Sequence, residues 1–207
     1  MNFQEFANKS QRENQIQNDQ IHYFSKYFCN VVAFSFYKLK FSPNLITLSF
    51  LIMGLLSAFA FYQKYFFLGW LSWRLMMVFD MADGSVARAT EKFSKVAYIF
   101  DKFNHLVINI LLIFIFAENI KNFFLLYLIL VSYLNYYLFN NFIKKNITYK
   151  SSVLSNFIKD LLTFEGFILS VILLNVFNNS NLIDFIFIFY SLMFISIFFY
   201  KIYIYKR

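Results

Sequence analysis

The residues of this chain that are best suited to chemistry fall in one short stretch, residues 79–105. It brings together three carboxylates, a guanidinium and an imidazole among apolar neighbours: Asp80, Asp83, Arg88, Asp101 and His105. Asp80 and Asp83 are three residues apart, and Asp101 and His105 are four apart, so each pair lies on one face of a helix. If the two helices pack antiparallel, the two pairs face each other.

Three converging carboxylates repel one another unless a divalent cation neutralises them, and Mg²⁺ or Mn²⁺ prefers such oxygen ligands. Gly84 and Ala87 are small where we expect the chain to turn into this site, so a nucleotide or pyrophosphate can approach the backbone closely. Arg88 supplies a guanidinium fork that suits phosphate oxygens. A metal, an arginine and a close backbone together describe a phosphoryl-transfer site.

The elements that carry these residues are predicted to be membrane helices. Of the 207 residues, 60% are hydrophobic and only 14% are charged, which is typical of an integral membrane protein and not of a soluble domain. A spanning helix needs about 20 mostly apolar residues. We therefore predict an all-α integral membrane protein, a bundle of six transmembrane helices at Ile46–Tyr62, Phe66–Met81, Val96–Ala117, Phe123–Ile143, Leu161–Phe177 and Leu182–Tyr203.

The distribution of Lys and Arg predicts the orientation of these spans. Most basic residues flank the spans on one side, whereas only Lys64 and Lys121 lie on the other. The positive-inside rule then places both termini and the charged loop in the cytoplasm, as for a multi-pass protein of the inner (cytoplasmic) membrane. The net charge of +8 indicates attraction to anionic membrane lipids, and we expect no nucleic-acid partner. The single cysteine, Cys29, makes a thiol-ligated metal site implausible.

The N-terminal segment, residues 1–43, is predicted to lie outside the transmembrane catalytic domain, residues 44–207. Apolar residues between Phe24 and Phe36 recur at roughly helical spacing, with polar residues between them. This pattern predicts an amphipathic helix in the membrane interface, although a hydrophobic linker would account for it too. Pro43 should stop this helix, and we expect Asn44 to cap the next one.

The same residues carry a resemblance to a known family. The string Asp80-x-x-Asp83-Gly84-x-x-Ala87-Arg88 is followed at fixed spacing by positions 97, 101 and 105. It resembles the signature of the CDP-alcohol phosphatidyltransferases, D-x-x-D-G-x-x-A-R-x8-G-x-x-x-D-x-x-x-D. The six-span layout and the segment SPNLIT before the first span are similar to that family as well, so the resemblance covers essentially the whole chain.

The resemblance implies an enzyme that transfers a phospho-alcohol or phosphatidyl group from a CDP-alcohol or CDP-diacylglycerol donor to an acceptor hydroxyl, releasing CMP. It implies a two-metal site of Mg²⁺ or Mn²⁺. Asp80, Asp83 and Asp101 would bind the metal, and Gly84, Ala87 and Arg88 would hold the CDP moiety. It also implies a homodimer, although no stripe of small residues in the sequence marks an interface.

Two positions depart from the family signature, because Ala97 replaces a glycine and His105 replaces the fourth aspartate. In the family that aspartate helps to hold the second metal and is the proposed base for the acceptor hydroxyl. An imidazole is a competent base near neutral pH but a weaker partner for Mg²⁺ than a carboxylate. We therefore expect either a base-only role for His105 or a preference for Mn²⁺, with Asp101 and His105 as the catalytic pair.

Because the fourth aspartate is absent, we predict a role in surface-glycan or specialised lipid synthesis, with a lipid or glycan acceptor. Three alternatives stay open at this point. The charged residues would also serve as a structural ion-pair network between two helices. The chain would fit a catalytically inactive relative that binds nucleotide or lipid or supports a partner enzyme. A small transporter with intramembrane carboxylates fits less well, since the charges cluster at one end of the spans.

Overall fold

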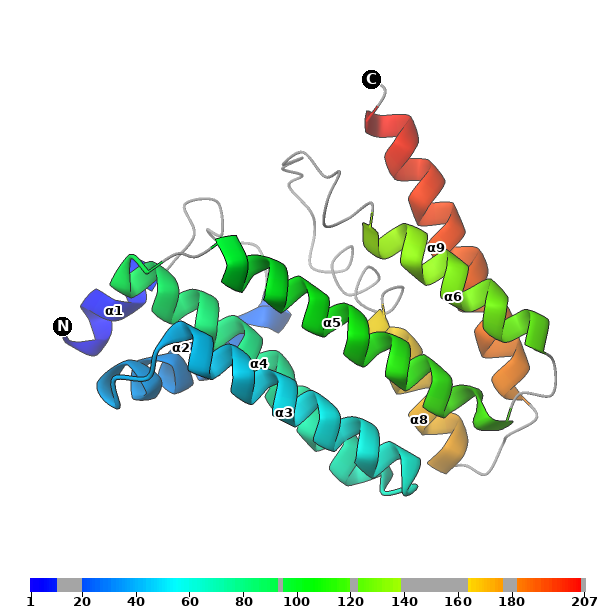
Figure 1. The fold of residues 1–207 in the computed structure, drawn as a ribbon, viewed down its shortest axis with the longest axis horizontal. Helices are drawn as coiled ribbons and strands as arrows, with labels where there is room; N and C mark the ends of the chain where they lie inside the picture. The colour runs from blue at the N-terminus through cyan, green and yellow to red at the C-terminus, as the bar shows by residue number, and fades with distance from the viewer. Residues whose placement is uncertain (11–19, 93–94, 120–122, 139–163, 177–181, 206–207) are drawn as a thin grey trace. The chain divides into compact units, whose positions relative to one another are not determined.

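The computed structural model describes residues 1–10, 20–92, 95–119, 123–138, 164–176 and 182–205. Within these ranges every regular element is a helix (Figure 1), which confirms the predicted all-α class. The elements are α1 (Phe3–Ser10), α2 (Gln20–Lys38), α3 (Pro43–Tyr62), α4 (Phe66–Thr90), α5 (Lys95–Phe116), the short 3₁₀ turn η1 (Ala117–Asn119), α6 (Phe123–Leu138), α8 (Phe164–Val176) and α9 (Ile183–Tyr205).

Three helices of the described residues are long and apolar enough to cross a membrane: Pro43–Tyr62, Tyr98–Phe116 and Ile183–Tyr200. Two further apolar helices, Phe123–Leu138 and Gly166–Asn175, are shorter, and the predicted ends of these spans at Ile143, Leu161 and Phe177 lie outside the described residues. The six-span count and the interfacial position of α2 therefore stay predictions.

The helix that carries the first half of the signature is longer than predicted. The second span was expected to end at Met81, with the chain turning near Gly84, but α4 continues without a break to Thr90. It ends where Glu91 adopts a left-handed backbone conformation and its N–H donates to the carbonyls of Ala87 and Arg88. The expected turn is thus wrong, and Asp80, Asp83 and Arg88 lie on one rigid helix.

The chain divides into two units, Met1–Ile108 and Asn109–Arg207. In the first unit, α3 and α4 form a helical hairpin that turns at residues 63–65. The helix cap before α3 differs from the prediction, because the hydroxyl of Ser42, and not Asn44, accepts a hydrogen bond from the Leu45 N–H (3.3 Å), with Pro43 in the first turn. Proline suits that position because its missing N–H has no partner in the first turn of a helix.

Gly54 lets helix α5 approach the hairpin closely. A Cβ atom at Gly54 would lie 2.8 Å from Cγ1 of Ile108 on α5 and 3.0 Å from the sulfur of Met76 on α4. Phe50 lies one turn before Gly54 on α3, and His105 lies about one turn before Ile108 on α5. The centroids of their rings are 4.7 Å apart. The close approach at Gly54 therefore helps to set the position of His105.

We expect Gly54→Val to lower the free energy of unfolding by about 1–3 kcal/mol, because the added side chain overpacks this contact. Thermal unfolding of the purified protein in detergent measures the effect. Leu55→Val is the control, since Leu55 neighbours Gly54 on the same helix but is exposed. A Gly54→Val protein as stable as the control would contradict the close packing of α5 on α3.

The second unit is held together by aromatic side chains and by polar pairs such as Asn109 with Tyr133. Tyr133 on α6 packs against Phe164 on α8 and Phe194 on α9, with ring centroids 4.9 and 5.7 Å apart. The buried hydroxyl of Tyr133 accepts a hydrogen bond from the side-chain amide of Asn109 (2.6 Å). This bond gives the buried Tyr133 hydroxyl a partner.

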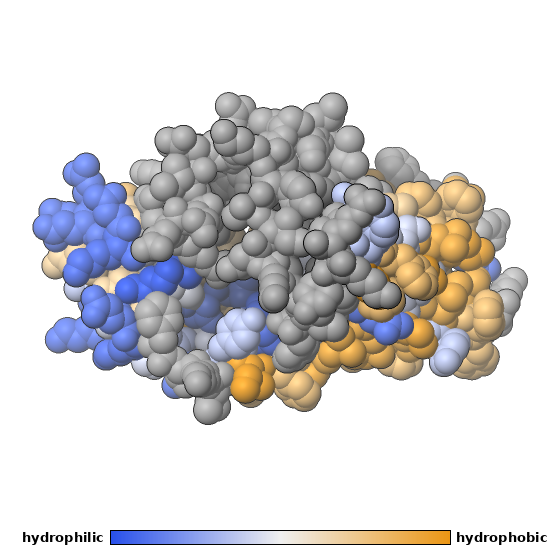
Figure 2. Space-filling model, turned by 90° about the horizontal axis from the view of Figure 1, so that it is seen from above, coloured by the Kyte–Doolittle hydropathy of each residue, from blue (hydrophilic) through white to orange (hydrophobic). Residues whose placement is uncertain are grey.

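The N-terminal helices α1 and α2 pack on α4 in the first unit. Phe6, Ala33 and Ile46 form one buried cluster with Ala82 and Val86 of α4. Figure 2 shows hydrophilic residues gathered at its left, the side on which α1 lies in Figure 1. The part of α4 that carries the signature is thus covered by the N-terminal segment.

Candidate active site

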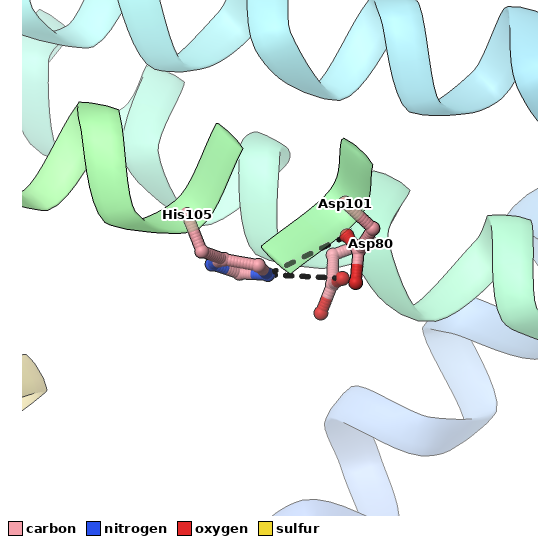
Figure 3. Close-up of side chains that lie close together, drawn as sticks. All are labelled: Asp80, Asp101 and His105. Carbon is pink, nitrogen blue, oxygen red and sulfur yellow. Dashed lines mark ion pairs between the residues drawn. The ribbon is translucent and has the colours of Figure 1, made fainter. Parts of the chain in front are cut away.

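Three of the predicted site residues converge on one point between α4 and α5. Nε2 of His105 lies 3.0 Å from Oδ1 of Asp80 and 3.8 Å from Oδ1 of Asp101, and the three side chains point toward one another (Figure 3). One ligand atom from each residue lies within 4.8 Å of the others. We predicted from the sequence that the pair of Asp80 and Asp83 faces the pair of Asp101 and His105. In the structure, Asp80 of the first pair meets both members of the second.

The polar atoms of this group fit a bound cation. Oδ2 of Asp101 lies 3.3 Å from the Lys102 ammonium, while its buried Oδ1 has no hydrogen-bond donor among the described residues. A buried carboxylate oxygen without a donor is costly unless a cation or water meets it. Two carboxylate oxygens and an imidazole nitrogen form a donor set that Mn²⁺ and Mg²⁺ accept, Mn²⁺ tolerating the nitrogen better.

Asp83, the third predicted metal ligand, is held by a hydrogen bond from helix α3. Its Oδ2 accepts a hydrogen bond of 2.6 Å from the hydroxyl of Thr47 on α3. Thr47 also donates to the carbonyl of Pro43 (3.1 Å). The group of three in the structure thus contains His105, whereas the predicted metal ligands were Asp80, Asp83 and Asp101.

Thr47 is a site residue that the sequence analysis missed. The signal was present, because Thr47 is the last residue of the segment SPNLIT, but its side chain could be paired with Asp83 only once α3 and α4 were placed side by side. The buried hydroxyl fixes one oxygen of Asp83. Thr47 therefore orients a carboxylate of the signature from a neighbouring helix.

We expect Thr47→Val to reduce the activity that the signature implies, CMP release from a CDP-alcohol, about tenfold, since it keeps the shape of the side chain and removes the donor to Asp83. Thr47→Ser keeps the hydroxyl and should retain most activity. The measurement is the initial rate of CMP formation for both variants at equal folded concentration. Equal rates for the valine and serine variants would show that the hydrogen bond does not matter.

Gly84, Ala87 and Arg88, the residues predicted to hold the CDP moiety, lie on the last two turns of α4. The Arg88 side chain bends back along the helix, so that its guanidinium lies beside Gly84. A Cβ atom built on Gly84 would lie 3.2 Å from Nη1 of Arg88. Nη2 donates to the hydroxyl of Ser85 (3.3 Å), and Nε donates to the carbonyl of Ser10 at the end of α1 (2.6 Å). Gly84 thus leaves room for the Arg88 guanidinium, and it lies within the helix and not at a turn.

Cys29 of α2 lies beside this region as a buried, unreactive thiol. Its sulfur lies 3.6 Å from the sulfur of Met81 on α4. Burial, with a contribution from the Asp80 carboxylate, raises the pKa of Cys29 to about 11. A thiol of that pKa stays protonated at neutral pH.

The fold and the site together define a membrane protein with a polar, carboxylate-rich centre between two helices. The sequence model of the CDP-alcohol phosphatidyltransferase family matches residues 40–200, most of the chain, so the chain belongs to this family. The resemblance found in the signature is thereby confirmed. A search of the curated proteins found no match.

Membership of the family establishes the general class of activity. Its enzymes transfer a substituted phosphate group from a CDP-alcohol to a hydroxyl acceptor, and they use divalent metal ions. The Asp80, Asp101 and His105 group is the place in the described residues that suits such an ion. The catalytically inactive alternative is not favoured by these findings.

Proposed function

We propose that this protein is an active, metal-dependent CDP-alcohol phosphotransferase whose reaction centre is the Asp80, Asp101 and His105 group. The observation that carries the proposal is the convergence of these three residues, together with the buried Asp101 oxygen that lacks a donor in the described chain. That oxygen lies 3.8 Å from Nε2 of His105, beyond hydrogen-bond distance, so a cation bound in the centre would give it a closer partner.

In the proposed reaction the acceptor hydroxyl forms a bond to the β-phosphorus of the CDP-alcohol. The bond from that phosphorus to the bridging oxygen breaks, and CMP leaves with the bridging oxygen and both electrons of the bond. Asp80, Asp83 and Asp101 would hold Mg²⁺ or Mn²⁺ in the predicted two-metal site, which leaves His105 free to act as the base. A bound divalent ion would neutralise the pyrophosphate charge.

His105 is proposed to accept the proton of the acceptor hydroxyl. Its Nε2 faces Asp80 at 3.0 Å, so the imidazolium that forms would be stabilised by a carboxylate. Phe50 packs against the imidazole ring and limits its rotation. Gly84, Ala87 and Arg88 would hold the CDP moiety, the arginine through its charge and its fork of donors.

The proposed setting is the inner membrane, with both termini and the site on the cytoplasmic side. The bias of basic residues supports this orientation, and the first half of the signature lies toward the end of α4 that carries Arg88 and is followed by Glu91 and Lys92. A water-soluble CDP-linked donor would reach the site from the cytoplasm. The acceptor hydroxyl, on a specialised lipid or a surface glycan precursor, would come from the membrane.

The test is CMP release by the purified protein in lipid nanodiscs, with a panel of CDP-alcohols, CDP-diacylglycerol and lipid extracts. We expect release that depends on Mn²⁺ or Mg²⁺ and stops when EDTA is added. Radiolabelled donor would show which lipid or glycan receives the phospho-alcohol. Release of CMP that is unaffected by metal removal would contradict the proposed centre.

A further inference from the structure

The N-terminal helix α1 makes a direct contact with the candidate nucleotide-binding arginine, although it precedes the family-matched residues 40–200. The carbonyl of Ser10, at the last residue of α1, accepts a hydrogen bond of 2.6 Å from Nε of Arg88. Seventy-eight residues of sequence separate the two partners. The contact is therefore a product of tertiary packing and not of local helix geometry.

Helix α1 is a well-defined element that is fixed at both ends. At its start, the side chain of Asn2 accepts from the Glu5 N–H (2.9 Å), and that of Glu5 accepts from the Asn2 N–H (3.0 Å). Such a reciprocal cap satisfies two N–H groups that would otherwise have no partner in the first turn. At its other end, the last carbonyls carry partial negative charge, which favours a cation such as Arg88.

Phe6 anchors α1 to the helix that bears the signature. It is 0% exposed and packs with Ala82, Val86 and Ala89 of α4. Its ring also lies 5.6 Å from Phe34 and 5.4 Å from Tyr37 on α2. The burial of this one side chain thus brings the end of α1 to Arg88.

We infer that α1 is a positioning element of the active site, which holds Arg88 over Gly84 in the conformation that binds the diphosphate of the CDP donor. Arginine has many rotamers, and fixing them before the ligand arrives lowers the ordering cost of binding. Ser10 fixes the Nε edge, Ser85 receives Nη2, and Gly84 leaves the space for Nη1. This inference rests on the proposed function, since it assigns the diphosphate as the ligand of Arg88.

The test is a double-mutant cycle read by calorimetric binding of CDP in the presence of Mn²⁺. Phe6→Ala releases α1 and should weaken CDP binding about tenfold, which corresponds to about 1.4 kcal/mol. In an Arg88→Ala background the same Phe6→Ala change should have no further effect, because α1 acts through the arginine. Gln4→Ala, on an exposed position of α1, is the control and should bind as the wild type does.

Three outcomes would overturn the inference. Equal CDP affinity of the wild type and Phe6→Ala would show that α1 does not position Arg88. An equal loss from Phe6→Ala in both backgrounds would show general destabilisation, which thermal unfolding detects independently. Absence of CDP binding by the wild type would overturn the proposed function together with the inference. If Phe6→Ala does not fold, Phe6→Leu, which removes only the ring contacts, carries the same cycle.

Discussion

Replacing Asp80 by asparagine is expected to lower CMP release by a factor of about 10³ or more. Asp80 is the carboxylate that faces both His105 and Asp101, and one of its oxygens lies 3.0 Å from His105 Nε2. Asparagine keeps the shape of the side chain but removes the charge that a divalent cation requires. Loss of several kcal/mol of stabilisation by a bound ion corresponds to such a factor.

The measurement is the rate of CMP release over a range of Mn²⁺ concentrations, with Asp184→Asn as the matched control. Asp184 lies in the first turn of α9 and is not a member of the site group. The control should react at the wild-type rate. Full activity of Asp80→Asn, or an equal loss in both variants with intact folding, would refute the assignment of Asp80 as a metal ligand.

Replacing His105 by alanine is expected to lower CMP release by about 10²–10⁴, the range attributed to a positioned general base. His105 also packs on Phe50, so part of the loss would come from the empty space beside that ring. His105→Asn separates the two effects, because it fills some of the space but accepts no proton near neutral pH. We expect the asparagine variant to be nearly as slow as the alanine variant.

His105→Asp restores the fourth aspartate of the family signature and tests the metal preference. The wild type should work better with Mn²⁺ than with Mg²⁺, and the aspartate variant should shift the ratio of rates toward Mg²⁺, since carboxylate suits Mg²⁺ better than imidazole does. A silent wild type and an active His105→Asp variant would reverse the conclusion. The natural chain would then be a disabled relative that keeps the site for binding or assembly.

The helical class, the family and the residues of the signature follow from the amino-acid sequence alone. Apolar runs of spanning length are local properties of the chain, and helices at Pro43–Tyr62, Tyr98–Phe116 and Ile183–Tyr200 follow from them. Spacings of three and four residues place Asp80 with Asp83 and Asp101 with His105 on common helix faces, because the helical repeat is fixed. The general class of reaction, transfer of a substituted phosphate group, can therefore be inferred from the signature without any tertiary contact.

Which of these residues meet depends on the packing of the helices in the tertiary structure. The convergence of His105 on Asp80 and the pairing of Asp83 with Thr47 depend on how α3, α4 and α5 rotate about their axes. That rotation is set by close packing at contacts such as Gly54 with Ile108, which no local pattern encodes. The bond from Arg88 to Ser10 depends likewise on the burial of Phe6. The helical repeat fixes which side chains share one face of a helix, whereas side-chain packing between helices fixes which residues that face contacts.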